Sequence, residues 1–184
     1  SSGMDWSAAN TENSKTSNQG NFTVCVDAGH QGSWVDMSAQ EPMAPGSSQT
    51  KNKATTGTSG NFSKVPEYEV NLEVSLVLQK ELISRGYNVI MTREDNDTAI
   101  SNKERAELAT EKGADITVRI HANGSEDSSV SGAMTICQTP QNPYNGALYA
   151  QSRALAENIL DYLTGQTGAK KQYVWETDTM SGIN

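Results

Sequence analysis

The sequence predicts an α/β fold in a single domain, with a mostly parallel or mixed twisted sheet and helices on both faces. Three observations lead to this prediction. The 184 residues are the size of one ordinary domain. Four short segments have the alternating pattern of strands, and three longer segments have helical periodicity. Strands that alternate with helices are typical of βαβ units, whose parallel sheets are covered on both faces.

The predicted strands are short segments in which apolar, mostly β-branched residues alternate with polar ones. They cover residues 22–27, 87–92, 115–120 and 132–138. No apolar run approaches the roughly 18 residues of a membrane-spanning helix, so we expect no membrane span in this chain.

The first predicted helix covers residues 67–85, after Pro66 at a position that suits helix entry and before Gly86 as its stop. Apolar residues recur in it at helical spacing, which predicts the face that the helix turns to the core. These residues are Val70, Val74, Val77, Leu78 and Leu82.

Two further helices are predicted, over residues 102–112 and 147–163. The earlier one begins with a capping box, because Glu104 follows Ser101 by three residues. The later one has an apolar side and Gly165 as its expected stop.

Two segments have no periodic pattern. Residues 1–21 are rich in Ser, Asn and Thr, and we expect a flexible N-terminal segment there. Residues 31–65 form an unusually long loop for a compact domain, and loops of this length tend to be functional or disordered. We expect this loop to be mobile or to wrap the rim of a site.

Charge and cysteine content exclude several classes of function. The chain has 14 Lys and Arg against 22 Asp and Glu, a net charge of −8, so no nucleic-acid partner is expected. Two cysteines are too few for a disulfide framework or a zinc ribbon. Cys25 and Cys137 lie in apolar alternation, which predicts two buried thiols.

The two histidines of the chain follow two predicted strands, where ligands bind in open α/β sheets. His30 comes after the first strand and His121 after the third, and the helix that starts at the same edge brings Glu67 and Glu69 near them. Two imidazoles and one carboxylate are the ligand set of a catalytic zinc site, and metal-assisted amide hydrolysis is the matching reaction. The alternative is that the histidines are structural and Glu67 complements the helix dipole.

The flanking sequences make this hypothesis more specific. The segments VDAGHQG, PEYEVNLEV and NKERAELATEKGADITVRIHANGS, in this order, resemble the zinc-dependent N-acetylmuramoyl-L-alanine amidases, a family of cell-wall hydrolases. The resemblance covers about residues 23–184 and implies that His30, Glu67 and His121 bind Zn²⁺, with Glu69 as the fallback for Glu67. Asp27 or backbone carbonyls are expected to fix the imidazole tautomers.

The resemblance also implies the reaction and its setting. The expected activity is hydrolysis of the amide bond between N-acetylmuramic acid and L-alanine in peptidoglycan, outside the cell or in the cell wall. Trp34 is expected either to stack on a sugar or to pack on the domain. Asn123 and Arg119 are further expected substrate contacts, whereas Arg93 and Arg105 match family positions that look structural.

One departure from the family pattern concerns the catalytic base. The family has a second essential glutamate in a Val-Glu-x-Gly-Phe motif, and the sequence ends before such a motif. We therefore expect residues 22–184 to be an amidase catalytic domain that lacks its last strand and helix, with low activity and association through an exposed sheet edge. Glu176 is a poor substitute for the base. The alternative is a catalytically impaired, metal-containing module that binds the cell wall or regulates another protein.

Overall fold

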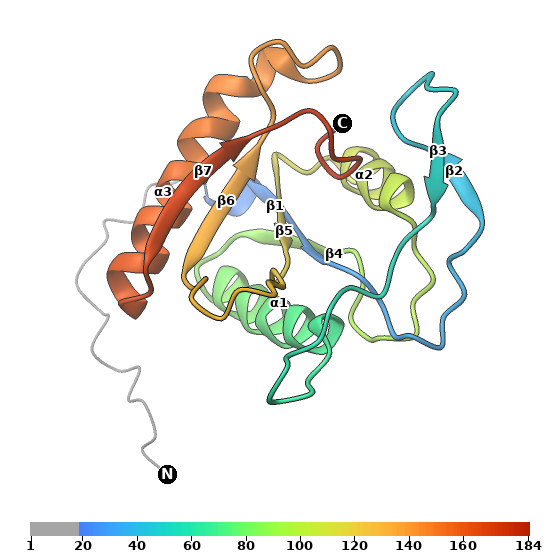
Figure 1. Ribbon diagram of the computed structural model, residues 1–184. Coiled ribbons are helices and arrows are strands. Elements are labelled where there is room, and N and C mark those ends of the chain that lie inside the picture. Colours follow the sequence, from blue (N-terminus) through green and yellow to red (C-terminus); the bar gives the residue numbers. More distant parts are fainter. Residues whose placement is uncertain (1–18) are drawn as a thin grey trace.

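The predicted α/β fold is confirmed in the computed structural model, which describes residues 19–184 (Figure 1). Most of the predicted N-terminal segment, residues 1–18, lies outside this described range. The chain enters the fold through a short 3₁₀ helix, Gln19–Asn21. None of the helices in the described range is long and apolar enough to cross a bilayer.

A parallel three-stranded sheet forms the centre of the molecule, in the order β4-β1-β5. The strands are β1 (Thr23–Ala28), β4 (Asn88–Met91) and β5 (Ile116–Ile120). β1 is buried from its second residue to its end because it has a neighbour on each side and a helix over each face. The carboxyl ends of β1 and β5 lie side by side, with Ala28 opposite Ile120. Residues that follow these two strands are therefore neighbours.

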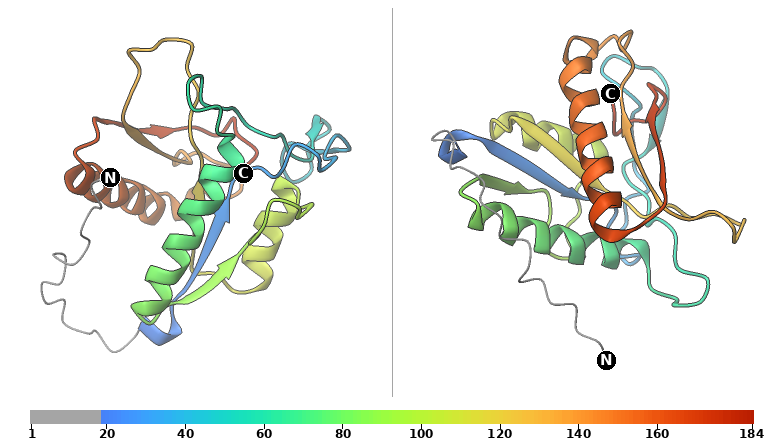
Figure 2. Two further views of the ribbon diagram at one scale, coloured as in Figure 1. Left: turned by 90° about the horizontal axis from the view of Figure 1, so that it is seen from below. Right: turned by 90° about the vertical axis from the view of Figure 1, so that its left-hand side faces the viewer.

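Helices α1 (Glu67–Ser84) and α2 (Asn102–Glu111) lie on opposite sides of this sheet (Figures 1 and 2). The capping box predicted for α2 is present, since the Ser101 side chain accepts from the Glu104 amide and the Glu104 side chain accepts from the Ser101 amide. Both helices begin at the edge of the sheet where β1 and β5 end, so their first turns help to form that edge.

The predicted core face of α1 is wrong in part. Val70, Val74 and Val77 have exposed fractions of 37, 48 and 67 %. The buried positions are instead Glu67, Tyr68, Asn71 and Ser75. Three of these are polar and follow one another at four-residue spacing, and the half-buried Leu78 and Leu82 continue the same face, so the prediction holds for these two leucines and fails for the three valines. The physical reason is that this face carries side chains of the site described below.

A second, two-stranded parallel sheet contains β6 (Ala133–Cys137) and β7 (Lys171–Glu176). Helix α3 (Tyr149–Thr167) packs on it, after a 3₁₀ turn over Gly146–Leu148. Figure 2 shows α3 alongside this pair of strands. Within residues 19–184 no ladder of backbone hydrogen bonds joins β5 to β6. The described sheet is thus divided into two parts.

Two details of this second sheet differ from the prediction. α3 continues past Gly165 to Thr167 and is capped by Gly168, whose φ of 70° is the left-handed conformation common at a helix C-terminus. β7 was not predicted, because its aromatic residues Tyr173 and Trp175 face outward while Gln172 and Glu176 are half-buried. The expected association through a sheet edge stays a prediction.

The long loop of residues 31–65 contains an antiparallel pair of short strands, β2 (Gln40–Pro42) and β3 (Thr50–Asn52). After β3 the chain returns to the carboxyl end of β1 before α1 begins. The loop therefore lies against the predicted site, as expected, and its mobility stays a prediction. Cys25 and Cys137 are buried free thiols, which confirms the prediction for them.

Candidate metal site

His30 leaves the end of β1 with its side chain already oriented. Its backbone is left-handed, with φ of 64°, a conformation that non-glycine residues adopt rarely and often at functional positions. The ring Nδ1 lies 2.7 Å from the backbone oxygen of Thr55. Because a carbonyl only accepts, Nδ1 carries the proton and Nε2 is left with a free lone pair. Thr55 thus fixes the tautomer that a metal ligand needs.

Glu67 is the first residue of α1 and is buried. Its Oε2 accepts from the Thr58 amide at 3.0 Å, and its Oε1 accepts from the Ala122 amide at 3.1 Å. Asn71, one turn later, donates to Oε1 at 3.3 Å and to the Gly29 oxygen at 3.1 Å. The carboxylate is therefore held by three separate segments of chain, and Asn71 also connects it to the end of β1.

His121 follows β5, and its ring lies directly over Gly29. A Cβ atom on Gly29 would be only 2.4 to 2.7 Å from atoms of the His121 ring. Only glycine allows this approach, because real Cβ contacts are longer than 3.0 Å. The Nδ1 atom of His121 faces Glu67 and His30.

The three side chains converge on one small triangle of atoms. His121 Nδ1 lies 2.9 Å from Glu67 Oε1 and 3.1 Å from His30 Nε2, and the His30 Nε2 to Glu67 Oε1 distance is 3.2 Å. Tetrahedral zinc with bonds of about 2.0–2.1 Å separates its ligand atoms by about 3.3–3.4 Å. Three acceptor atoms this close repel one another unless a cation or a shared proton lies among them. The donor set and its spacing therefore fit a metal ion.

The charge of Glu67 is consistent with binding of a metal ion. Burial disfavours its ionised form, but the neighbouring His121 and His30 rings and the hydrogen bond from the Thr58 amide outweigh burial and hold the pKa of Glu67 well below its usual range. The site therefore presents a carboxylate at neutral pH.

A strap of the long loop closes one side of the triangle. Gly57, with φ of 78°, lies so close that a Cβ atom there would be 2.6 Å from Glu67 Oε2 and 2.6 Å from His30 Cδ2. Its neighbours Thr55 and Thr58 supply the hydrogen bonds to the two ligands described above. We call residues 55–58 the strap.

Arg93 connects the end of β1 to the first turn of α1. It is buried, and it donates from Nε to the Ala28 oxygen at 2.8 Å. Its Nη2 donates both to the Gly29 oxygen and to the Tyr68 oxygen, each at 2.9 Å. Gly29 and Tyr68 are the sequence neighbours of His30 and Glu67. One rigid guanidinium thus fixes the backbones that carry two of the three ligands.

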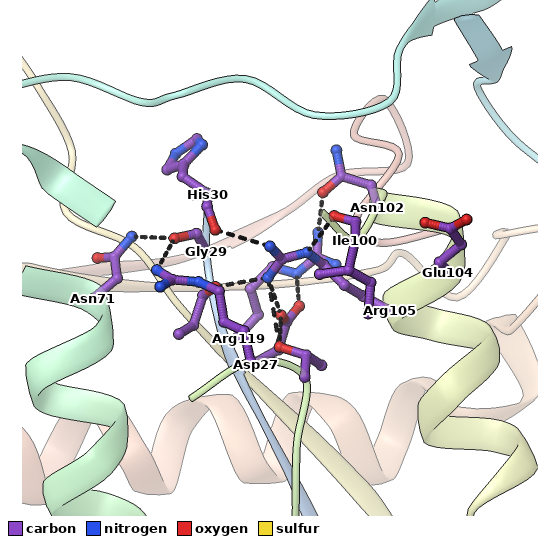
Figure 3. A network of polar contacts seen from close by, with 12 residues as sticks. Asp27, Gly29, His30, Asn71, Ile100, Asn102, Glu104, Arg105 and Arg119 are labelled. Atoms are coloured by element: carbon purple, nitrogen blue, oxygen red, sulfur yellow. Dashed lines mark hydrogen bonds and ion pairs between the residues drawn. The ribbon is translucent and has the colours of Figure 1, made fainter. Parts of the chain in front are cut away.

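Arg105 of α2 holds the same turn from the other side of the sheet (Figure 3). It donates to the Ala28 oxygen at 2.6 Å, to the His30 oxygen at 2.8 Å and to Asp27 Oδ1 at 2.6 Å. In Figure 3 the imidazole of His30 points away from this network while its carbonyl oxygen faces Arg105. Arg105 therefore stabilises the left-handed backbone that directs the ring outward.

Asp27 accepts hydrogen bonds from residues of this network, and none of its hydrogen bonds within residues 19–184 comes from the imidazoles. Its other oxygen accepts from Arg119, and Thr92 donates to Oδ1 at 2.7 Å. Burial raises the pKa of Asp27, but Arg119 and Arg105 outweigh this effect and lower the value to about 2. Of the two predicted means of fixing the tautomers, the structure shows a backbone carbonyl, that of Thr55, at His30.

Comparison with known proteins identifies the family of the chain. The family model of N-acetylmuramoyl-L-alanine amidases, Amidase_3, matches residues 24–182. The chain belongs to this amidase family. It is 32 % identical over 108 residues to the N-acetylmuramoyl-L-alanine amidase LytC of Bacillus subtilis (strain 168), a match that covers 59 % of this chain and 20 % of LytC. The chain thus matches about one fifth of the length of that relative.

Solved amidase structures share the fold. Ami1 of Mycobacterium smegmatis superposes with a TM-score of 0.78 at 24 % identity, over 91 % of this chain and 78 % of Ami1. The catalytic domain of CwlV from Bacillus (Paenibacillus) polymyxa var. colistinus gives 0.63 at 23 % identity, over 89 % of this chain and 73 % of that domain. At these identities the likeness is one of fold.

The other predicted residues of this amidase domain lie as follows. Glu69, the fallback ligand, is exposed, so Glu67 is the carboxylate that meets the histidines. Asn123 is exposed two residues after His121 and lies 3.2 Å from the Met134 sulfur. Arg119 is half-buried against Asp27, and its role as a substrate contact stays a prediction.

Glu176 is bound elsewhere in this amidase domain. It accepts from the Tyr149 hydroxyl and from Arg153 Nη1, the latter at 2.9 Å, on the α3 side of β7. Sequence reasoning missed the strap residues Thr55, Gly57 and Thr58, since they lie in a segment without periodicity. A signal for Asn71 was present, because it follows Glu67 by one helical turn and so shares its face.

Proposed function

We propose that this protein is a zinc-dependent hydrolase of peptidoglycan that cleaves the amide bond between N-acetylmuramic acid and L-alanine. The observation that carries the proposal is the triangle of His30 Nε2, Glu67 Oε1 and His121 Nδ1, with sides of 2.9 to 3.2 Å. Membership of the amidase family supports the choice of bond. Because this substrate is part of the cell wall, the protein acts there, outside the cytoplasm.

The residues of the chain prepare the site before substrate arrives. His30, Glu67 and His121 would hold the ion through two imidazole nitrogens and one carboxylate oxygen, which is a ligand set of catalytic zinc sites. A zinc ion in such a site polarises a carbonyl group and lowers the pKa of its water, which suits amide hydrolysis. The Thr55 oxygen keeps the proton of His30 on Nδ1, and the amides of Thr58 and Ala122 keep the Glu67 carboxylate in place.

The ligand assignment is tested by a matched pair of variants on the first turn of α1. Glu67→Gln removes the charge with little change in shape, and Glu69→Gln makes the same change on an exposed side chain two residues away. We expect bound zinc, measured by elemental analysis after dialysis, to fall to background in Glu67→Gln and to stay at one per chain in Glu69→Gln. Zinc retained by Glu67→Gln and lost by Glu69→Gln would refute the assignment.

The reaction is tested on purified cell walls by the release of peptides that begin with L-alanine. The unaltered chain should release them, and chelation of the metal should abolish the release.

A second candidate, a metal-containing module that binds the cell wall with impaired catalysis, is favoured by one observation. Glu176, the carboxylate weighed as a substitute base, is already bound by Tyr149 and Arg153. Zinc-dependent binding to cell walls without peptide release would support this second candidate and refute the first.

A further inference from the structure

A pocket lies beside the candidate metal site, on the side formed by the long loop. Its volume is about 450 Å³, within the range of ligand pockets. Thr55 belongs to both places, because it lines the pocket while its backbone oxygen accepts from His30 Nδ1. A ligand in this pocket therefore lies next to the ligands of the proposed metal. We call it the Trp34 pocket.

Trp34 is fixed in position and yet exposed. Its six-membered ring lies on Gly32, where a Cβ atom would be 2.5 to 2.7 Å from the ring atoms. Its Nε1 donates to Asp97 at 2.6 Å, and its ring meets Tyr68 edge-to-face with centroids 5.9 Å apart. Nevertheless 63 % of Trp34 is exposed. A rigid, exposed indole is a platform on which a ligand can stack with little further loss of side-chain entropy.

Gln31 lines the pocket and has one buried hydrogen-bonding atom without a partner in the described part of the chain. It is 1 % exposed, and its Nε2 donates to the Thr55 oxygen at 3.2 Å. Its Oε1 finds no donor among residues 19–184. A buried acceptor without a donor is unfavourable by about 1–3 kcal/mol, so a ligand that brings an N–H or O–H group would relieve it. The orientation of this amide follows from the Thr55 oxygen, which can only accept.

The other residues that line the Trp34 pocket favour an uncharged, polar ligand. Asp36 is the charged side chain among the lining residues, and the polar ones carry hydroxyl or amide groups. These polar side chains include Asn52, Thr56 and Ser38. A negatively charged ligand, such as an acidic peptide, is disfavoured by Asp36. An uncharged ligand with one apolar face and many hydroxyl or N–H groups matches both the indole and this lining, and a pyranose ring has that chemistry.

We propose that the Trp34 pocket is a glycan subsite that binds one N-acetylhexosamine unit. The apolar face of the sugar stacks on Trp34, and a sugar N–H or hydroxyl group donates to Gln31 Oε1 as the pocket adjusts. This inference deepens the proposed function and rests on it for the source of the glycan, the strand that carries the scissile amide.

The test measures binding of tetra-N-acetylchitotetraose, a soluble glycan without a peptide, to the 184-residue chain by calorimetry. Trp34→Ala should weaken binding by about tenfold or more, equal to about 1.4 kcal/mol, and Trp34→Phe should restore part of it. Gly32→Ala keeps the indole but displaces it, and should weaken binding as well. Trp175→Phe, at another exposed tryptophan on β7, is the control and should bind like the unaltered chain.

The outcomes separate this inference from the proposed function. Equal affinity of the unaltered chain and Trp34→Ala, or no saturable binding by a folded, zinc-loaded chain, would overturn the glycan subsite even if peptides are released from cell walls. Tighter binding of a free acidic stem peptide, lost in Trp34→Ala, would also overturn it. Glycan binding that depends on Trp34, in a chain that releases no peptide, would support the subsite and refute the hydrolase.

Discussion

Substitution of Gly57 by alanine, compared with the same change at Gly46, distinguishes an effect on the proposed metal ligands from an effect on the backbone of the loop. Gly57 has φ of 78°, and its new Cβ would lie 2.6 Å from Glu67 Oε2 and from His30 Cδ2. Gly46, in the same loop, has nearly the same φ of 75°, but a methyl group added there would have no atom within 4 Å. The two substitutions therefore impose the same backbone strain, and Gly57→Ala alone presses on the ligands.

The magnitudes follow from this geometry. The left-handed backbone makes each alanine unfavourable by about 1–2 kcal/mol. In Gly57→Ala, relief of a 2.6 Å contact to an ordinary 3.4 Å requires a shift of about 0.8 Å in the strap or the ligands, whereas metal bonds tolerate about 0.2 Å. We expect zinc affinity to fall by about 10- to 100-fold, which is the usual effect of disturbing the groups around metal ligands. This range equals about 1.4–2.8 kcal/mol.

The assay pairs two measurements on each variant. Urea unfolding of the metal-free chain gives the free energy of unfolding, and competition with a chromophoric chelator gives the zinc affinity. Both variants should lose stability, Gly57→Ala more than Gly46→Ala because its methyl group also presses on Glu67 and His30, and Gly57→Ala alone should lose zinc affinity. Equal zinc affinities in Gly57→Ala and Gly46→Ala would show that the strap does not constrain the site and would refute the reasoning.

Three further predictions concern the interior next to the site. Arg119 and Arg105 outweigh burial and lower the pKa of Asp27 to about 2, so its charge stabilises the fold above about pH 4 by about 2 kcal/mol, and this contribution is lost as the pH falls from about 4 to about 2. Urea midpoints across this range should show the loss, and Asp27→Asn should make the pH dependence smaller by about this amount, the remainder coming from other carboxylates such as Glu67. Arg105→Lys should lower the free energy of unfolding by about 3 kcal/mol and also weaken zinc binding, because one ammonium group cannot replace a guanidinium that bonds Asp27 and two backbone oxygens. Unchanged zinc affinity in this variant would contradict the conclusion that Arg105 holds the backbone of His30. Burial, with Asp27 nearby, raises the pKa of Cys25 to about 11, so a thiol reagent at about pH 8 should modify Cys25 only after unfolding.

The sequence predicted the elements whose signals are local. The capping box at Ser101 and the strands on either side of it needed no knowledge of the rest of the chain. The positions of His30 and His121 after parallel strands were sufficient to place them together, because neighbouring parallel strands end at one edge.

Other features depend on tertiary contacts that periodicity does not record. The first turns of the inner face of α1 are polar because Asn71 bonds both Glu67 and Gly29, so hydrophobic spacing wrongly turned the three valines of these turns to the core. β7 places Tyr173 and Trp175 outward, against the usual pattern of a strand. The strap is held by hydrogen bonds between its own backbone and the ligands, which residues of any type could make at Thr55 and Thr58. Gly57 must be glycine, but a glycine in a loop without periodicity does not indicate which side chains it approaches.

The division between β4-β1-β5 and β6-β7 has a consequence for local unfolding. All three proposed ligands, the strap and the arginines around them belong to segments before residue 122, whereas β6, α3 and β7 form a second hydrogen-bonded unit. Proteins open in cooperative units that follow such boundaries. Amide protons of β6 and α3 should therefore exchange with solvent at a free energy of opening different from that of β1. Zinc should slow exchange in β1 and β5 far more than in α3.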